Sequence, residues 1–286
     1  MTVRSPLVSA DWLKENLDAP DLRVVEATWY PPFVHHFQTG LEAYTSGHIP
    51  GSVFFDIDHV CDPDSPFPHT LPPAHVFSAR VRKLGLGDGN RLIVYDRNRF
   101  FASARVWWMF RLMGLSDVFV LDGGLGAWTD AGGELEDMAP VAVERHFTPR
   151  VRADLMKSTE QVEAIAKDKS IPIIDGRPHA RFTGEAKEPR ADLESGHIPG
   201  SVSLPGDELI DPAGLLKSEA ELHALFAERG IDPIAQMVAT CGSGVTAAIL
   251  ALAAATLGNG LVAVYDGSWT EWASDSKRPI ETGVSG

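Results

Sequence analysis

Apolar and polar positions along the chain predict short strands separated by helices. Runs of apolar, partly β-branched residues occur at 22–27, 52–55, 92–95 and 118–121, and each has the length of a strand. A longer apolar stretch at 103–113 has the length of a helix. Strands that alternate with helices are typical of a parallel sheet covered on both faces. The first half of the chain is therefore predicted to be an α/β domain.

The second half repeats the same order of elements. The block Ser-Gly-His-Ile-Pro-Gly-Ser-Val at 46–53 recurs unchanged at 195–202. Matching landmarks in the same order indicate two copies of one domain. We predict an α/β fold of two tandem domains, each a parallel sheet flanked by helices. The strands expected in the second copy are 171–175, 201–204, 237–240 and 261–265, with a helix at 245–257.

Prolines and a lack of regularly spaced apolar residues mark the junction between the copies. Ser9 and Ser158 each precede an amphipathic stretch and are predicted to be helix N-caps. We therefore place an N-terminal domain at 1–138, a linker at 139–157 and a C-terminal domain at 158–286.

Composition narrows the class of protein. The chain has 286 residues, of which 44% are hydrophobic and 22% charged, as in a folded globular protein. A net charge of -14 argues against a nucleic acid or an acidic membrane as partner. Two cysteines exclude a disulfide scaffold and fit a reducing compartment. No apolar run approaches the roughly 18 residues of a membrane span, and no signal peptide is evident, so we expect a cytoplasmic protein.

Cys241 is the strongest candidate for chemistry. It follows the predicted strand 237–240, and ligands of α/β sheets bind at the carboxyl ends of strands. Glycines in the next residues permit a tight loop whose amides point inward, and a helix start adds further N–H donors. Such a loop stabilises a thiolate or a persulfide. The loop residues are Gly242, Ser243, Gly244, Val245 and Thr246.

Cysteine-dependent phosphatases and arsenate reductases also hold a thiolate in a backbone cradle. They use the pattern Cys-x5-Arg, in which the arginine clamps an oxyanion. The sixth residue after Cys241 is Ala247, so this loop lacks the guanidinium. The sequence therefore argues against phosphoryl transfer.

Together, these motifs resemble the two-domain rhodanese superfamily, and within it most closely the 3-mercaptopyruvate sulfurtransferases. The motifs are Cys-Gly-Ser-Gly-Val-Thr-Ala, two His-Ile-Pro-Gly turns, Leu-Asp-Gly-Gly-Leu-Gly-Ala-Trp and Tyr-Asp-Gly-Ser-Trp-x-Glu-Trp. The resemblance covers essentially the whole chain. It implies that the N-terminal domain has lost its cysteine, because Asp96 occupies that position. It also implies a catalytic C-terminal domain with its active site in the cleft between domains, and no metal or cofactor.

The loop also bears on the sulfur donor. Thiosulfate sulfurtransferases of this family resemble Cys-Arg-Lys-Gly-Val-Thr, where basic side chains suit a dianion, whereas Gly242 and Ser243 follow the mercaptopyruvate pattern. The resemblance implies that sulfur moves from 3-mercaptopyruvate through a Cys241 persulfide to a thiol such as thioredoxin, or to cyanide, with release of pyruvate. The alternatives are a thiosulfate:cyanide sulfurtransferase, a persulfide carrier and a non-enzymatic partner-binding module.

Three further residues match functional positions of the family. Arg181 and Arg190 match its substrate-binding arginines, and arginine can hold a carboxylate through paired hydrogen bonds. The alternative is that both are solvated loop residues. Ser243 is expected to relay a proton or to orient the substrate.

His48 has two interpretations. The family resemblance implies a catalytic histidine in the first His-Ile-Pro-Gly turn, and His48 matches it. However, His197 occupies the same slot in the second copy, which favours a structural role for both. No Asp lies between Asp21 and Asp56, so a Ser–His–Asp relay through His48 lacks an evident acid.

A loop rich in Pro and Asp contains His59, Cys61 and His69. The spacing of these residues matches no familiar metal-binding pattern. We interpret them as loop residues and expect Cys61 to be non-catalytic.

Overall fold

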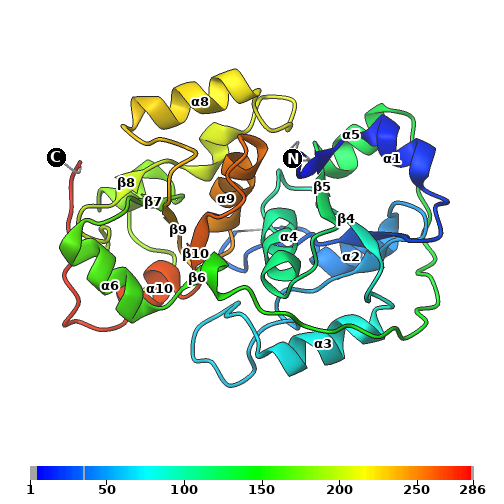
Figure 1. The fold of residues 1–286 in the computed structure, drawn as a ribbon, viewed down its shortest axis with the longest axis horizontal. Coiled ribbons are helices and arrows are strands. Elements are labelled where there is room, and N and C mark those ends of the chain that lie inside the picture. Colours follow the sequence, from blue (N-terminus) through cyan, green and yellow to red (C-terminus); the bar gives the residue numbers. More distant parts are fainter. Residues whose placement is uncertain (1–4, 35, 285–286) are drawn as a thin grey trace. The chain divides into compact units, whose positions relative to one another are not determined.

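The computed structural model describes residues 5–34 and 36–284, which form two compact units. Both units are parallel sheets flanked by helices (Figure 1). Unit 1 comprises Met1–Asp64, Leu71–Arg152 and Pro212–Leu216, and unit 2 comprises Ser65–Thr70, Ala153–Asp211 and Lys217–Gly286.

Unit 1 contains a five-stranded sheet in the order β1-β5-β4-β2-β3, and every pairing is parallel. The strands are β1 (Leu7–Val8), β2 (Leu22–Glu26), β3 (Val53–Phe54), β4 (Arg91–Tyr95) and β5 (Val118–Leu121). The helices are α1 (Ala10–Asn16), α2 (Gly40–Ser46), α3 (Ala74–Lys83), α4 (Ser103–Leu112) and α5 (Gly124–Asp130).

Unit 2 contains a second five-stranded parallel sheet, in the order β6-β10-β9-β7-β8. The strands are β6 (Met156–Lys157), β7 (Ile173–Asp175), β8 (Val202–Ser203), β9 (Val238–Thr240) and β10 (Ala263–Tyr265). The helices are α6 (Thr159–Asp168), α7 (His179–Phe182), α8 (Glu219–Glu228), α9 (Ala247–Thr256) and α10 (Ser268–Trp272), with 3-10 turns η1 (Ala153–Leu155) and η2 (Gly206–Leu209).

The two sheets have the same topology, strand for strand, with β4 corresponding to β9 and β2 to β7. This confirms the predicted α/β fold of two repeated domains. Two edge strands, β1 and β6, were not predicted. Each spans only two residues, which is too short to show a periodic pattern.

Helix starts follow the capping chemistry of the sequence. The Ser9 hydroxyl accepts a hydrogen bond from the amide of Trp12, which caps α1 as predicted. Ser158 caps α6 in a reciprocal pair with Gln161, again as predicted. The central strands, β4 in unit 1 and β9 in unit 2, are largely buried. The residue that follows each strand, Asp96 or Cys241, lies at the carboxyl edge of its sheet.

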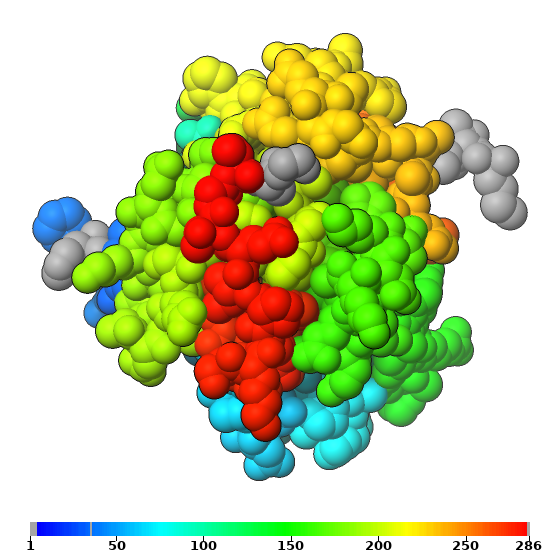
Figure 2. Space-filling model, turned by 90° about the vertical axis from the view of Figure 1, so that its left-hand side faces the viewer, coloured from blue at the N-terminus to red at the C-terminus, as the bar shows by residue number. Residues whose placement is uncertain are grey.

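The C-terminal segment lies over the surface of unit 2 (Figure 2). Arg278 donates to Glu163 of α6 at 2.7 Å, and the amide of Gly283 donates to the carbonyl of Thr183 at 2.7 Å. The segment therefore connects α6 to the region that follows α7. Within the described residues, every helix is too short or too polar to cross a membrane.

Candidate active site

Cys241 directly follows β9 and is only 2% exposed. Its amide donates to the hydroxyl of Ser268 at 3.1 Å, and its carbonyl accepts from the amide of Trp269 at 3.0 Å. The carbonyl of Gly242 accepts from the amide of Thr270 at 2.9 Å. The first turn of α10 therefore fixes the backbone on either side of the sulfur.

The loop after Cys241 turns directly into α9. Gly244 has a φ of +75°, a conformation that glycine adopts without strain. Across residues 5–34 and 36–284, we find no acceptor for several loop amides, which leaves them available to an anion on the sulfur. These are the amides of Gly242, Ser243, Val245 and Thr246.

Asp96 occupies the equivalent place in unit 1, directly after β4. The amide of Leu125 donates to the carbonyl of Asp96 at 3.0 Å, just as that of Trp269 donates to Cys241. The two carbonyls therefore have equivalent partners, whereas the side chains at this place differ.

The Asp96 carboxylate accepts hydrogen bonds from the amides of its own loop. The distances are 3.1 Å from Asn98, Phe100 and Ala102 and 2.9 Å from Ser103. Burial raises the pKa of Asp96, against the opposing effect of these bonds. The loop of unit 1 therefore directs its amides at its own carboxyl group, whereas the loop of unit 2 has amides available for a transferred anion.

Arg181, on α7, lies beside the sulfur-bearing loop. Its Nη2 is 3.2 Å from the position that a Cβ on Gly242 would take. Its Nε donates to Oε1 of Glu188 at 3.2 Å, and its Nη2 donates to Oε2 of the same residue. The carboxylate of Glu188 is 7% exposed and fixes the direction of the guanidinium.

A second arginine holds Glu188 from the other side. Arg177 donates to Glu188 at 2.9 Å and binds Asp175, the last residue of β7, through two of its nitrogens. The Arg177 guanidinium also lies over the ring of Trp269, 4.3 Å from the centroid. Arg181 is therefore positioned by a buried network that starts at the sheet edge.

Arg190 adds a second cation to the site. Its Nη1 donates to Oγ1 of Thr270 at 3.2 Å, and Thr270 Oγ1 donates to the carbonyl of Gly242 at 2.6 Å. Burial and the charge of Arg181 lower the pKa of Arg190, while the charges of Glu188 and Cys241 oppose that shift. Two guanidiniums thus act on the Cys241 loop in a protein whose net charge is -14.

His69 also reaches the loop, with Nδ1 3.2 Å from Oγ of Ser243. It belongs to the segment Ser65–Thr70, which lies in unit 2 although it precedes α3 in the chain. A hydrogen bond of 2.8 Å between the hydroxyls of Ser65 and Thr70 closes this segment. His69 is 6% exposed, and its contact with Ser243 is partly buried.

His48 and His197 have matching surroundings in their own units. His48 stacks on Tyr44, with centroids 4.0 Å apart, and its Nδ1 lies 2.9 Å from the Tyr44 carbonyl. His197 stacks on Phe182 at 3.8 Å, and its Nδ1 lies 2.8 Å from the Phe182 carbonyl. Both rings are buried.

The two histidines also share a backbone pairing. Each exchanges two amide–carbonyl hydrogen bonds with a glutamate, His48 with Glu136 and His197 with Glu281. The repeated arrangement ties each His-Ile-Pro-Gly turn to a later strand-like segment. These contacts support the structural interpretation that the sequence left open.

A model of the rhodanese-like domain matches the chain twice, at residues 9–131 and 158–275. This chain belongs to the rhodanese family. The two matches fall on the two repeated sheets, so this is a tandem rhodanese in which only the second copy carries a cysteine after its central strand.

Named rhodanese relatives extend along nearly the whole chain. The 3-mercaptopyruvate sulfurtransferase of Escherichia coli is 40% identical over 274 residues, which cover 96% of this chain and 97% of the relative. The thiosulfate/3-mercaptopyruvate sulfurtransferase 2 of Arabidopsis thaliana is 38% identical over 301 residues, covering 98% and 87%. The crystal structure of SseA from Escherichia coli has a TM-score of 0.85 at 38% identity, covering 93% of this chain and 99% of that one.

The structure gathers Cys241, Ser243, Arg181 and Arg190, all candidates from the sequence, at one edge of the second rhodanese sheet. His69 was interpreted from sequence as an ordinary loop residue, whereas the structure places it against Ser243. No local motif marks it, because it lies in an irregular loop 174 residues from its partner. Within the described residues, no group of three or more His, Cys, Asp or Glu side chains is placed to hold a metal.

Proposed function

We propose that this rhodanese transfers sulfur from 3-mercaptopyruvate, through a persulfide on Cys241, to a thiol acceptor or to cyanide, and releases pyruvate. The observation that carries this proposal is the Cys241 loop. It has a buried sulfur, two nearby guanidiniums and, within the described residues, amides without an acceptor at Gly242, Ser243, Val245 and Thr246, but no basic side chain. Relatives of 38–40% identity that carry 3-mercaptopyruvate in their names support it.

The first half-reaction forms one S–S bond and breaks one C–S bond. The Cys241 thiolate attacks the sulfur of 3-mercaptopyruvate, and the C–S electron pair becomes the enolate of pyruvate. The proton of the substrate thiol is transferred to the enolate carbon, which gives pyruvate. Cys241 is left as a persulfide anion, and the loop amides and the start of α9 stabilise its charge.

Ser243 and His69 are suited to move that proton. The hydroxyl of Ser243 and Nδ1 of His69 are 3.2 Å apart, so a proton can pass along this pair. We place His69 in this relay. We assign His48 to holding the first His-Ile-Pro-Gly turn, because its buried ring stacks on Tyr44 and its Nδ1 lies at hydrogen-bond distance from the Tyr44 carbonyl.

Arg181 and Arg190 are suited to hold the α-keto acid. Arg181 is fixed by Glu188, and Arg190 is linked through Thr270 to the carbonyl of Gly242. A carboxylate bound between the two guanidiniums would bring the substrate sulfur toward Cys241. Binding energy from the non-reacting carboxylate would then serve to orient the C–S bond.

The second half-reaction returns the thiolate. The thiolate of the acceptor attacks the outer sulfur of the persulfide, so the acceptor becomes a persulfide and Cys241 leaves as its thiolate. We propose thioredoxin or another thiol as the acceptor, and a reducing compartment such as the cytoplasm as the location. Both cysteines are free, which is consistent with such a compartment.

Initial rates with two donors test this function. Cyanide serves as acceptor, and 3-mercaptopyruvate is compared with thiosulfate in wild type, Cys241→Ser and Cys61→Ser. We expect a strong preference for 3-mercaptopyruvate, loss of activity in Cys241→Ser and full activity in Cys61→Ser. Preference for thiosulfate would support the alternative donor, and inactivity with both donors would favour a persulfide carrier or a partner-binding module.

A further inference from the structure

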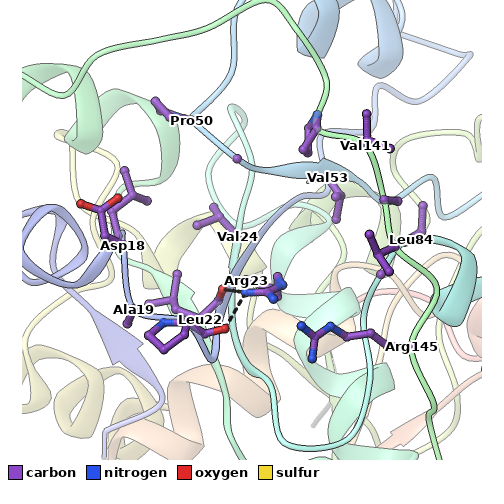
Figure 3. Close-up of a pocket in the computed structure, with 17 residues that line it drawn as sticks. Asp18, Ala19, Leu22, Arg23, Val24, Pro50, Val53, Leu84, Val141 and Arg145 are labelled. Atoms are coloured by element: carbon purple, nitrogen blue, oxygen red, sulfur yellow. Dashed lines mark hydrogen bonds between the residues drawn. The ribbon is translucent and has the colours of Figure 1, made fainter.

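A pocket in unit 1 brings together two arginines, Arg23 and Arg145 (Figure 3). Its volume is about 430 Å³, within the roughly 300–1,000 Å³ of small-molecule sites. Arg23 lies near the start of β2, whereas Asp96 follows the end of the neighbouring parallel strand β4. The pocket is therefore at the amino end of this sheet, opposite the edge that carries Asp96.

The Arg23 side chain is folded back onto its own turn. Its Nη1 donates to the carbonyl of Pro20 at 3.0 Å and also to that of Leu22. Burial and the charge of Arg145 lower the pKa of Arg23, and Asp21 partly opposes this shift. Figure 3 shows the guanidiniums of Arg23 and Arg145 directed toward one another.

Arg145 is held in place by its backbone. Its amide donates to the carbonyl of Arg82 at 3.3 Å, and its carbonyl accepts from Nε of Arg82 at 3.1 Å. A Cβ on Gly87 would lie 2.7 Å from the Cβ of Arg145, so glycine allows the close approach of this segment. The backbone that carries the Arg145 guanidinium is therefore fixed within unit 1.

Nearby carboxylates do not neutralise the pair. Asp21 forms its ion pair with Arg91 at 3.2 Å. Asp18 lines the pocket on the side away from Arg145 (Figure 3). Among the residues that the structure describes, neither Arg23 nor Arg145 has a carboxylate within ion-pair distance. Two repelling cations are therefore left open to an anion.

Apolar side chains form the rest of the wall. Leu84 and Val53 line the pocket together with Val141 and Val143 of the segment 140–145. Val141 is 93% exposed and Val143 is 74% exposed, which is unusual for neighbouring apolar residues. A ligand with an apolar body would cover them while its anionic end met the arginines.

We propose that this pocket binds a small carboxylic acid with an apolar chain, held by Arg23 and Arg145. The two guanidiniums take the carboxylate, and the chain lies along Leu84 and the valines of 140–145. Residues 140–145 form one wall of the pocket and lead toward β6. A bound ligand would therefore hold this segment against the rest of unit 1.

Calorimetric titration with hexanoate, coupled to hydrogen exchange, tests the proposal. We expect hexanoate to bind more tightly than acetate, by up to about fourfold for each methylene that becomes buried. Exchange at residues 140–145 should slow on binding. Arg23→Ala and Arg145→Ala should each weaken this binding by about tenfold, as expected for loss of a charge-assisted pair. Arg150→Ala, which removes the same charge five residues further along the chain and outside the pocket, should not.

Several outcomes would overturn the proposal. They are equal affinity for acetate and hexanoate, equal loss in Arg150→Ala and Arg145→Ala, tighter binding of inorganic phosphate than of hexanoate, and protection of 241–246 without protection of 140–145. The last would mean that the acid binds only beside Cys241. Because the readout is binding rather than sulfur transfer, failure here leaves the proposed function untouched.

Discussion

Nδ1 of His69 lies 3.2 Å from Oγ of Ser243, although 174 residues separate them in the chain. The contact links an irregular loop to the loop that carries Cys241. It gives the hydroxyl a partner that can accept and return a proton.

Removing either member of the relay should slow sulfur transfer. We expect His69→Ala and Ser243→Ala each to lower kcat by about 100-fold, the lower range for a positioned proton donor. The double variant should be little worse than either single one, because the two act as a unit. Steady-state rates of pyruvate release measure this, with His59→Ala, an exposed histidine of the same loop, as control. Additive losses would show that the two residues do not share one role.

Glu188 should act through Arg181 rather than on substrate. We expect Arg181→Ala to raise KM for 3-mercaptopyruvate by about 10-fold to 100-fold, since a charge-assisted hydrogen bond contributes about 1.5–3 kcal/mol. Glu188→Gln should raise KM by less, because it loosens the guanidinium without removing it. Arg229→Ala, which breaks an ion pair with Glu208 elsewhere in unit 2, is the control. A change confined to kcat would contradict a role in substrate binding.

Asp96 should stabilise unit 1 without serving the chemistry. In Asp96→Asn, the amide nitrogen would face loop amides that now donate to a carboxylate. Since each buried unsatisfied donor costs about 1–3 kcal/mol, we expect unit 1 to lose roughly 2 kcal/mol of unfolding free energy. Native-state hydrogen exchange of β4 measures that loss, with the exposed Asp130→Asn as control. A fully stable Asp96→Asn would show that the carboxylate is dispensable to the loop.

The unfolding free energy of unit 1 should also depend on pH, because Asp96 titrates differently in the folded and unfolded states. Burial raises its pKa in the folded state, so folded unit 1 keeps the proton to a higher pH than the unfolded chain does. The contribution to stability is complete below the ordinary pKa of about 4 and is lost as pH rises through the folded value. The free-energy difference between wild type and Asp96→Asn should therefore shrink as pH rises through this window. A difference that grows with pH would mean that the folded pKa lies below the ordinary one.

His48 and His197 should behave as a structural pair. We expect His48→Asn and His197→Asn each to lower stability by about 1–3 kcal/mol, because each leaves a buried carbonyl contact and a stacking site unfilled. The kcat of His48→Asn should stay within about threefold of wild type, well below the loss expected of a relay histidine. Urea unfolding and steady-state rates measure the two effects. A 100-fold fall in kcat at unchanged stability would show that His48 takes part in the reaction.

Most of the fold could be predicted from the sequence because the chain contains two copies of the same pattern of strands and helices. Identical His-Ile-Pro-Gly blocks and matching apolar runs defined both sheets, and hydroxyl caps at Ser9 and Ser158 marked helix starts. The edge strands β1 and β6 were missed because two residues cannot show an alternating pattern.

The site was predicted to different degrees. The Cys241 loop could be read from glycines at a strand end, whereas Arg181 and Arg190 required the family resemblance. His69 could not be found, because its contact with Ser243 depends on how a distant loop folds back. The arginine pair at Arg23 and Arg145 likewise depends on long-range packing of 140–145 against Gly85 and Gly87.

The proposed reaction places the transferred sulfur on Cys241. A single-turnover experiment, with 3-mercaptopyruvate and no acceptor, checks this by pairing peptide mass spectrometry with a pyruvate assay. We expect the Cys241 peptide to gain one sulfur atom as an equal amount of pyruvate is released, in wild type and Cys61→Ser but not in Cys241→Ser. Pyruvate release without sulfur on Cys241, or sulfur on Cys61 instead, would rule out a Cys241 persulfide.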